Sequence, residues 1–435
     1  MSEEIKPFRR IIRGLGSVLG GKAGAGLIGL GYLLIATRAL GPRDYGVLML
    51  VHGYVTAVCA IVEFPAWQAV VRYGEEAHVE QNPARLIRLL NFSARVELLG
   101  GVFAILIAAT FAPVVGPHLG WPPEVQYYAI PYSIALLGSI RSVPAGYLQL
   151  IDRFDLLGWH NLVTPLVRLV GSIIVLATGG GIIQFLIVWM VAALAEFTTL
   201  WGLGLWQARK HLDDPVHKPE PGHVPTENPG IWRFLISSNA DLTLRQLANK
   251  LAPLIVGWTL GPAMAGLLSV AQRATVVIDP VAQILGDTSY STWAKIIHKD
   301  GARTKLRKTL LRVALLAAAI CLPLVLIVSF FSEDLIRLLA GAAYVSAAPI
   351  MVYLVIARSI AFMGPPCGSA LSAMGHPSWS LWSNLAANFA ALSLLPWLLT
   401  RYGLFGAAYQ SMIQAVVATV LLLIMIRRAA KRLPA

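Results

Sequence analysis

The sequence predicts an all-α polytopic membrane protein, with twelve transmembrane helices arranged as two parallel six-helix lobes. The chain of 435 residues is 57% hydrophobic and 13% charged, with a mean hydropathy of +0.67. Its apolar residues fall into stretches of roughly 20, the length that an α-helix needs to cross a bilayer. A soluble core rarely holds so many such stretches, so we expect lipid to be the main solvent.

Twelve apolar stretches follow one another along the chain, and each ends at glycine, proline or charge. The first half contains the expected helices 16–40, 45–72, 86–112, 127–150, 157–178 and 182–207. The second half contains the expected helices 231–260, 263–293, 308–331, 345–373, 379–401 and 404–426. Glycine and proline end helices by backbone geometry, whereas charged residues stay outside the hydrocarbon.

Basic residues lie in alternate loops, which predicts the orientation of the chain. Retention of lysine and arginine on the cytoplasmic side places both termini in the cytoplasm. One set of loops carries Lys6, Arg9, Arg10, Arg13, Arg85, Arg88, Arg153, Arg209, Lys210, Lys218, Lys295, Lys299, Arg303, Lys305, Arg307, Lys308, Arg427, Arg428, Lys431 and Arg432. The opposite loops carry Arg43, Arg337 and Arg401. This alternation requires an even number of helices, and it explains the net charge of +13 without nucleic acid.

A polar, proline-rich stretch divides the chain into an N-terminal lobe at 1–208, a cytoplasmic linker at 209–230 and a C-terminal lobe at 231–435. The two lobes share a short motif after their first helix. Leu40-Gly41-Pro42 with Gly46 and Leu48 matches Leu260-Gly261-Pro262 with Gly266 and Leu268, at an offset of 220 residues. Six helices in each lobe make such repeats parallel, which favours two lobes around a central cavity that opens by rocking.

Charges inside the expected spans are the informative residues, because each is costly in lipid unless it is paired or faces water. The cations are Lys22, Arg95, Arg141, Arg168, Arg245, Lys250, Arg273 and Arg358. The acids are Glu63, Glu97, Glu196, Asp241 and Asp279. Asp241 and Arg245 are one helical turn apart and can neutralise each other.

The excess of cations predicts an anionic substrate. Guanidinium forks bind phosphate oxygens well, and charges are poorly screened in a cavity of low dielectric constant. We therefore expect the eight cations to contribute to a substrate-binding lumen, with Lys250 and Arg273 as the strongest candidates near mid-span. Each cation has the alternative of an intramolecular ion pair or of reaching the membrane interface. Ion coupling is expected to use Glu63, Glu196, Asp241 or Asp279.

The basic N-terminal arm, the glycine-rich first helix and the run Leu40-Gly41-Pro42-Arg43-Asp44-Tyr45-Gly46 carry a family resemblance. Together they resemble the polysaccharide transporter family of oligosaccharide-lipid flippases, which belongs to the multidrug/oligosaccharidyl-lipid/polysaccharide exporter superfamily. The resemblance implies a V-shaped, alternating-access transporter of the bacterial inner membrane. It also implies translocation of undecaprenyl-diphosphate-linked oligosaccharide to the periplasmic leaflet, for O-antigen, capsule or exopolysaccharide assembly. Polysaccharide polymerase and chain-length regulator are the partners expected beside substrate and lipid.

Two other classes stay open. A multidrug cation extruder of the same fold would favour an acidic or aromatic cavity, whereas the expected interior here is basic. A membrane glycan polymerase or ligase would usually carry a large periplasmic loop. The expected loops on that side are short and bring together no paired carboxylates and no nucleophile with a base, so neither catalytic residues, a metal nor a cofactor is expected.

Overall fold

The structure, a computed structural model, describes residues 5–62, 66–212, 223–273, 275, 278–297 and 301–431. These residues are almost entirely helical and contain no β-strand. They group by their contacts into two compact units. Unit 1 comprises the described residues of Met1–Leu40 and Val51–Lys250, and unit 2 comprises those of Gly41–Leu50 and Leu251–Ala435.

Two long helices, α1 (Ile5–Val62) and α10 (Ile231–Leu260), contribute residues to both units. The remaining helices of unit 1 are α2 (Trp67–Val79), α3 (Pro83–His118), α4 (Pro123–Tyr132), the 3-10 helix η1 (Ser133–Ser139), α5 (Ser142–Leu150), α6 (Phe154–His160), α7 (Val163–Ala177), α8 (Ile182–His211) and α9 (Val224–Glu227). Within this unit α8 packs against α7, η1 and α5, which places α8 beside the break between η1 and α5.

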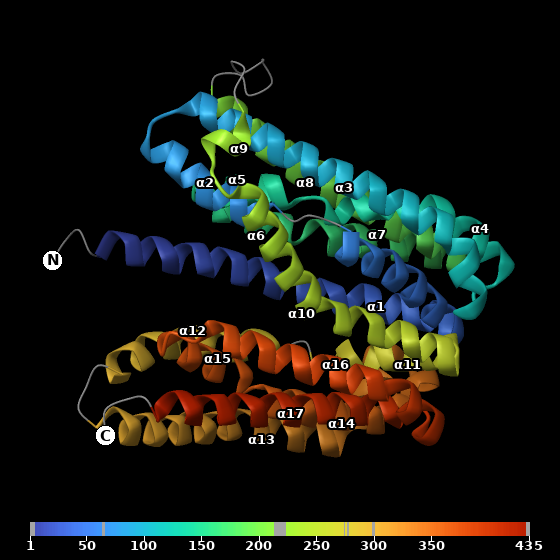
Figure 1. Ribbon diagram of the computed structural model, residues 1–435. Coiled ribbons are helices and arrows are strands. Elements are labelled where there is room, and N and C mark those ends of the chain that lie inside the picture. Colours follow the sequence, from blue (N-terminus) through green and yellow to red (C-terminus); the bar gives the residue numbers. More distant parts are fainter. Residues whose placement is uncertain are drawn as a thin grey trace. The chain divides into compact units, whose positions relative to one another are not determined.

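The remaining helices of unit 2 are α11 (Pro262–Arg273), α12 (Ile278–Ile297), α13 (Ala302–Ala340), the 3-10 helix η2 (Ala342–Ala347), α14 (Ala348–Ala361), α15 (Gly364–Ala373), α16 (Pro377–Tyr402) and α17 (Phe405–Ala430). In this unit α17 packs against α14, α15 and α16, and α13 packs against α14 (Figure 1). Fully buried Trp293, Cys367 and Leu422 are part of the core that joins α12, α15 and α17.

Each of the twelve predicted segments is helical over most of its described length, but several are broken. Residues 127–150 hold α4, η1 and α5, and residues 263–293 hold α11 and α12. Among the described residues, seven helical stretches are long and apolar enough to cross a membrane, and one of them, Gly20–Val62, covers most of the first predicted span and most of the second. Breaks interrupt the predicted spans 127–150 and 263–293, whereas α10 and α16 are continuous helices that are not among the seven. The number of twelve spans therefore stays a prediction.

The outer faces of these helices are apolar and exposed, as a bilayer requires. Phe103 on α3 is 59% exposed and Phe330 on α13 is 80% exposed. In the most apolar stretch of α13 only 17% of the residues are buried. A water-soluble protein rarely exposes continuous apolar surfaces of this length. The predicted class, an all-α polytopic membrane protein, is therefore confirmed.

Helix α17 shows how unit 2 matches the thickness of a bilayer. Aromatic rings gather at its start, where Tyr409 lies 5.4 Å from Tyr402 and 5.8 Å from Tyr353 between ring centroids. Arg427 and Arg428 lie in its last turn. The helix rises about 33 Å from Phe405 to Arg427, close to the hydrocarbon thickness of about 30 Å. Aromatic residues at one end and cations at the other are typical of interfacial anchors.

The two copies of the Leu-Gly-Pro motif meet within unit 2. Gly41 has a φ of +69° and Gly261 a φ of +86°, so each motif breaks the helix at the same glycine in the left-handed region. A side chain added at Gly46 would overlap the backbone of Pro262, and one added at Gly266 would overlap the backbone of Pro42. The contacts are reciprocal, so each repeat uses its second glycine to approach the other.

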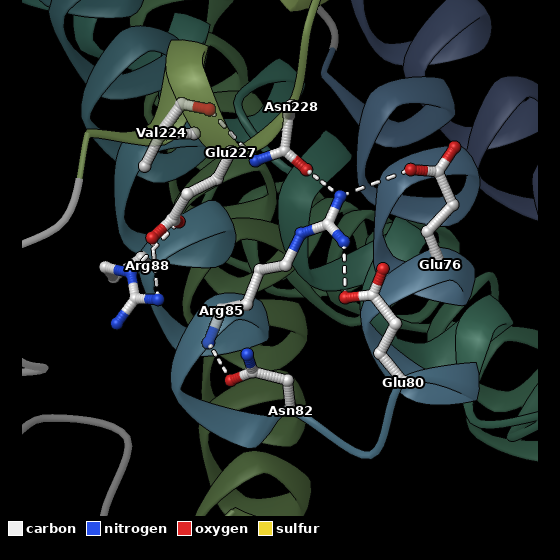
Figure 2. A network of polar contacts seen from close by, with 8 residues as sticks. All are labelled: Glu76, Glu80, Asn82, Arg85, Arg88, Val224, Glu227 and Asn228. Atoms are coloured by element: carbon white, nitrogen blue, oxygen red, sulfur yellow. Dashed lines mark hydrogen bonds and ion pairs between the residues drawn. The ribbon is translucent and has the colours of Figure 1, made fainter.

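The end of the predicted linker is anchored to unit 1 through Arg85 (Figure 2). The Arg85 guanidinium donates to Glu80 at 2.6 Å, to Glu76 at 3.2 Å and to the Asn228 side chain at 2.9 Å. Arg88 forms a two-pronged ion pair with Glu227, with N···O distances of 3.0 and 2.7 Å. Residues 213–222 lie outside the described part of the chain, but α9 and Asn228 hold the following segment on α2 and α3.

Candidate functional site

The site begins at Arg141, in the break between η1 and α5. Glu97 on α3 is fully buried and accepts hydrogen bonds from the backbone amides of Ser142 at 2.5 Å and Val143 at 2.8 Å. A carboxylate at a helix N-terminus satisfies free amides and favours the helix dipole. Glu97 therefore fixes the first turn of α5 and with it the backbone from which Arg141 extends.

The side chain of Arg141 forms an ion pair with Glu196 on α8. Glu196 also accepts a hydrogen bond of 2.7 Å from the Thr164 hydroxyl of α7, and its carbonyl oxygen accepts one of 3.0 Å from Nε2 of His160. The Arg141 side chain is 39% exposed and that of Glu196 is 18% exposed. We name Arg141, Glu196, Thr164 and His160 the Arg141 cluster. It joins a partly exposed cation to a carboxylate that also accepts from Thr164, while His160 donates to the backbone of the same glutamate.

Arg168 lies one helical turn beyond Thr164 on α7 and is 8% exposed. The guanidinium carbon lies 4.9 Å from the ring centroid of Trp189 and 5.7 Å from that of Tyr32. Its buried Nε has no hydrogen-bond partner in the described part of the chain, and no described carboxylate pairs with it. Aromatic faces offset part of the cost of burying this charge, but they supply no acceptor for the Nε–H group.

In unit 2, Arg358 on α14 pairs with Asp279 on α12 at 3.2 Å. Both side chains are well exposed, at 41% and 58%, so water screens this pair strongly. Two of the four predicted coupling acids, Glu196 and Asp279, are thus paired with predicted lumen cations.

The other predicted site residues are not gathered into one described cluster. Lys22 on α1, Arg95 on α3 and Arg273 at the end of α11 are exposed, and Lys250 on α10 is partly buried. Glu63 and the side chains of Asp241 and Arg245 lie outside the described residues, so their pairing and roles stay predictions. The roles in the lumen and in ion coupling stay predictions for all twelve residues.

Sequence reasoning missed Tyr32, Trp189, His160 and Thr164. One signal for the last two was available, because His160, Thr164, Arg168 and Ser172 follow one another at steps of four in an otherwise apolar segment. That spacing places polar side chains on one helix face. The contacts with Trp189 and Tyr32 come from distant helices and leave no such pattern.

Comparisons with known proteins decide the family. Residues 35–349 match the family described as "Polysaccharide biosynthesis protein". The chain belongs to that family. "Inner membrane protein YghQ" of Escherichia coli is 27% identical over 340 residues, which cover 78% of this chain and 95% of that protein. The resemblance expected from the Leu-Gly-Pro motif is therefore confirmed.

Solved structures show the same fold at low sequence identity. A multidrug resistance MATE family transporter of the MOP superfamily, in its inward-facing conformation, matches with a TM-score of 0.70 at 14% identity, covering 94% of this chain and 95% of that one. The lipid II flippase MurJ, in its inward closed conformation, matches with a TM-score of 0.63 at 13% identity, covering 94% and 86%. This member of the polysaccharide biosynthesis family therefore has a transporter fold.

Proposed function

We propose that the protein is a flippase that moves undecaprenyl-diphosphate-linked oligosaccharide from the cytoplasmic to the periplasmic leaflet, for O-antigen, capsule or exopolysaccharide assembly. The family match over residues 35–349 carries the proposal, because it connects polysaccharide biosynthesis with a fold that a lipid flippase shares. A charged, hydrophilic glycan cannot cross hydrocarbon unaided, so such a pathway needs a protein that shields it.

Arg141 and Arg168 suit a diphosphate in this proposal. Arg168 is a buried cation whose Nε finds no acceptor among the residues that the structure describes, and phosphate oxygens are strong acceptors for guanidinium donors. Arg141 is partly exposed and forms an ion pair with the carboxylate of Glu196. A diphosphate could replace that carboxylate as the partner of Arg141. Other predicted lumen cations are proposed to contact the substrate at other points of its path across the membrane. They are Lys22, Arg95, Arg245, Lys250, Arg273 and Arg358.

Among the four coupling candidates, Glu196 has the environment that best supports the role. Its carboxylate competes with substrate for Arg141, so a proton taken up by Glu196 would weaken the ion pair and release Arg141 to the diphosphate. Thr164 can keep a hydrogen bond to either form of the carboxyl group. Proton uptake and substrate binding would then favour each other at the same arginine.

The proposed setting is the bacterial inner membrane with both termini in the cytoplasm. The inner-membrane name of the Escherichia coli relative and the twenty basic residues in alternate loops support it. A polysaccharide polymerase and a chain-length regulator are the proposed partners, because the flipped unit must be polymerised on the periplasmic side. The proposal assigns no catalytic residue.

A multidrug extruder is the second candidate, and the MATE-like fold favours it. Such a protein would bind cations, and the positive charge of buried Arg168, which pairs with no described carboxylate, would repel them. A membrane glycan polymerase or ligase is a weaker candidate, because the described residues of the site form ion pairs and aromatic contacts rather than a nucleophile with a base.

Deletion of the gene tests the proposal against both alternatives. A flippase deletion is expected to lower surface glycan and to accumulate undecaprenyl-diphosphate oligosaccharide in the membrane, with restoration by the wild-type gene. Unchanged surface glycan with increased sensitivity to cationic drugs would instead identify an extruder. Accumulated oligosaccharide on the periplasmic leaflet would identify a polymerase or ligase.

A further inference from the structure

A groove opens at the end of unit 2 where α13 begins and α17 ends. It has a volume of about 680 Å³ and lies between the first turns of α13 and the last turns of α17. Four cations line it, and all of them are exposed: Arg303, Arg307, Arg427 and Lys431. We name it the basic groove.

The groove continues from these cations into an apolar channel, walled by Leu310, Ala314, Met363 and Leu423. Along α13 the distance from Arg303 to Ala314 is about 16 Å at the rise of an α-helix. That length leads from the headgroup level of a bilayer well into its hydrocarbon. The groove is therefore polar where a lipid headgroup would lie and apolar where an acyl chain would lie.

The four cations have no carboxylate partner in the part of unit 2 that the structure describes. Interfacial anchors alone would need no recess behind them, because a lysine or arginine at a helix end reaches headgroups from a flat surface. Here two cations from α13 and two from the end of α17 converge on one channel. Convergent donors above an apolar channel favour an occupant that has both an anionic and an apolar part.

We propose that the basic groove binds an anionic phospholipid of the surrounding membrane, with its phosphate among Arg303, Arg307 and Arg427 and one acyl chain along Ala314. The charge of the groove selects an acidic headgroup over a zwitterionic one. This lipid is separate from the transported substrate, for which Arg141 and Arg168 of unit 1 are proposed, so the groove adds a lipid requirement to the protein.

Native mass spectrometry of the full-length protein, released from micelles that contain phosphatidylglycerol or phosphatidylcholine, tests the proposal. Wild type is expected to retain phosphatidylglycerol in preference to phosphatidylcholine. The triple variant Arg303→Gln, Arg307→Gln, Arg427→Gln is expected to bind phosphatidylglycerol at least about tenfold more weakly, because each interfacial cation contributes to the attraction. The matched triple variant Lys308→Gln, Arg312→Gln, Arg428→Gln removes the same charge outside the groove and is expected to bind as wild type does.

A variant that keeps every charge tests the apolar half. Ala314→Trp fills the channel and is expected to displace the retained phosphatidylglycerol, whereas Leu316→Trp on the other face of α13 is expected to leave it. Equal loss in the two triple variants, or retention of phosphatidylglycerol by Ala314→Trp, would overturn the proposal. A competition experiment with undecaprenyl phosphate identifies the occupant. Stronger retention of that lipid than of phosphatidylglycerol at the groove would show that the occupant is a polyprenyl lipid and would overturn the assignment to a membrane phospholipid.

Discussion

Arg168 is a buried cation in a protein that crosses the membrane, where an unpaired charge is costly. Arg168, a residue that is 8% exposed, brings a positive charge into a membrane-embedded unit, and the rings of Trp189 and Tyr32 face it, with no carboxylate among the described residues. A cation–π contact contributes about 2 kcal/mol when it is desolvated, less than the cost of burying an arginine. An anionic substrate would supply the missing acceptor.

Arg168→Gln is expected to lower glycan translocation by a factor of about 10 or more, because it removes the charge and the fork that bind phosphate. Arg209→Gln, at the exposed end of α8 and outside the proposed lumen, is the matched control and is expected to have little effect. Surface glycan and membrane protein level are measured together. Normal glycan with Arg168→Gln at normal protein level would remove Arg168 from the site.

Glu196→Gln mimics a permanently protonated carboxyl group and is expected to weaken the pair with Arg141. Transport by this variant should no longer respond to a proton gradient, whereas the variant Asp279→Asn should keep the wild-type response. The measurement is the initial rate in proteoliposomes with and without an inward proton gradient. A wild-type response in Glu196→Gln would assign coupling to another residue.

Among the elements, the helical segments were predictable, their ends only in part, and the contacts between them not at all. The predicted helix 231–260 has the bounds of α10, because apolar content and Gly261-Pro262 define both its length and its end. The predicted helix 308–331 is shorter than α13, since the charged turns around Arg303 and Arg307 remain helical beyond the hydrocarbon. The ion pair of Arg141 with Glu196 joins residues that are far apart in the sequence, so the spacing of residues along one helix could not predict it.

The reciprocal glycine contacts predict a sharp difference between glycines of one helix. Gly46→Ala places a methyl group against the backbone of Pro262 and is expected to destabilise the protein by about 1–3 kcal/mol. Gly26→Ala, also on α1, meets nothing within 4 Å and should be neutral or stabilising. Thermal unfolding of the purified protein compares them. Equal melting temperatures for the two variants would show that the motifs do not need this close approach.

The Arg85 network makes a second prediction at this scale. Arg85→Met keeps the length of the side chain but leaves Asn228 and two carboxylates without their shared donor, so we expect the segment after residue 222 to detach more readily. Faster cleavage there in limited proteolysis is the expected result, with a loss of about 1–3 kcal/mol in stability. Arg153→Met, which removes the exposed pair with Asp155, is the control. Identical cleavage in both variants would show that Arg85 does not hold the linker.

At the scale of the whole molecule, the sequence repeat and the compact units divide the chain differently. The motif repeats place the second half after the linker at 209–230, whereas the contacts group residues up to Lys250 with unit 1 and residues 41–50 with unit 2. Gly46 and Gly266 explain why residues 41–50 belong to unit 2, because their close approach packs the first motif against the second. The repeated motif indicates a duplication but not which copy packs with which unit.

If the protein moves a lipid-linked glycan between leaflets through cationic contacts, leaflet translocation in proteoliposomes must depend on the protein and on those contacts. Vesicles with purified protein and undecaprenyl-diphosphate oligosaccharide are compared with empty vesicles and with vesicles that carry Arg168→Gln. We expect protein-dependent transfer that falls by about tenfold or more in the variant. Transfer equal to that of empty vesicles, with several glycans and under several ion gradients, would contradict this expectation.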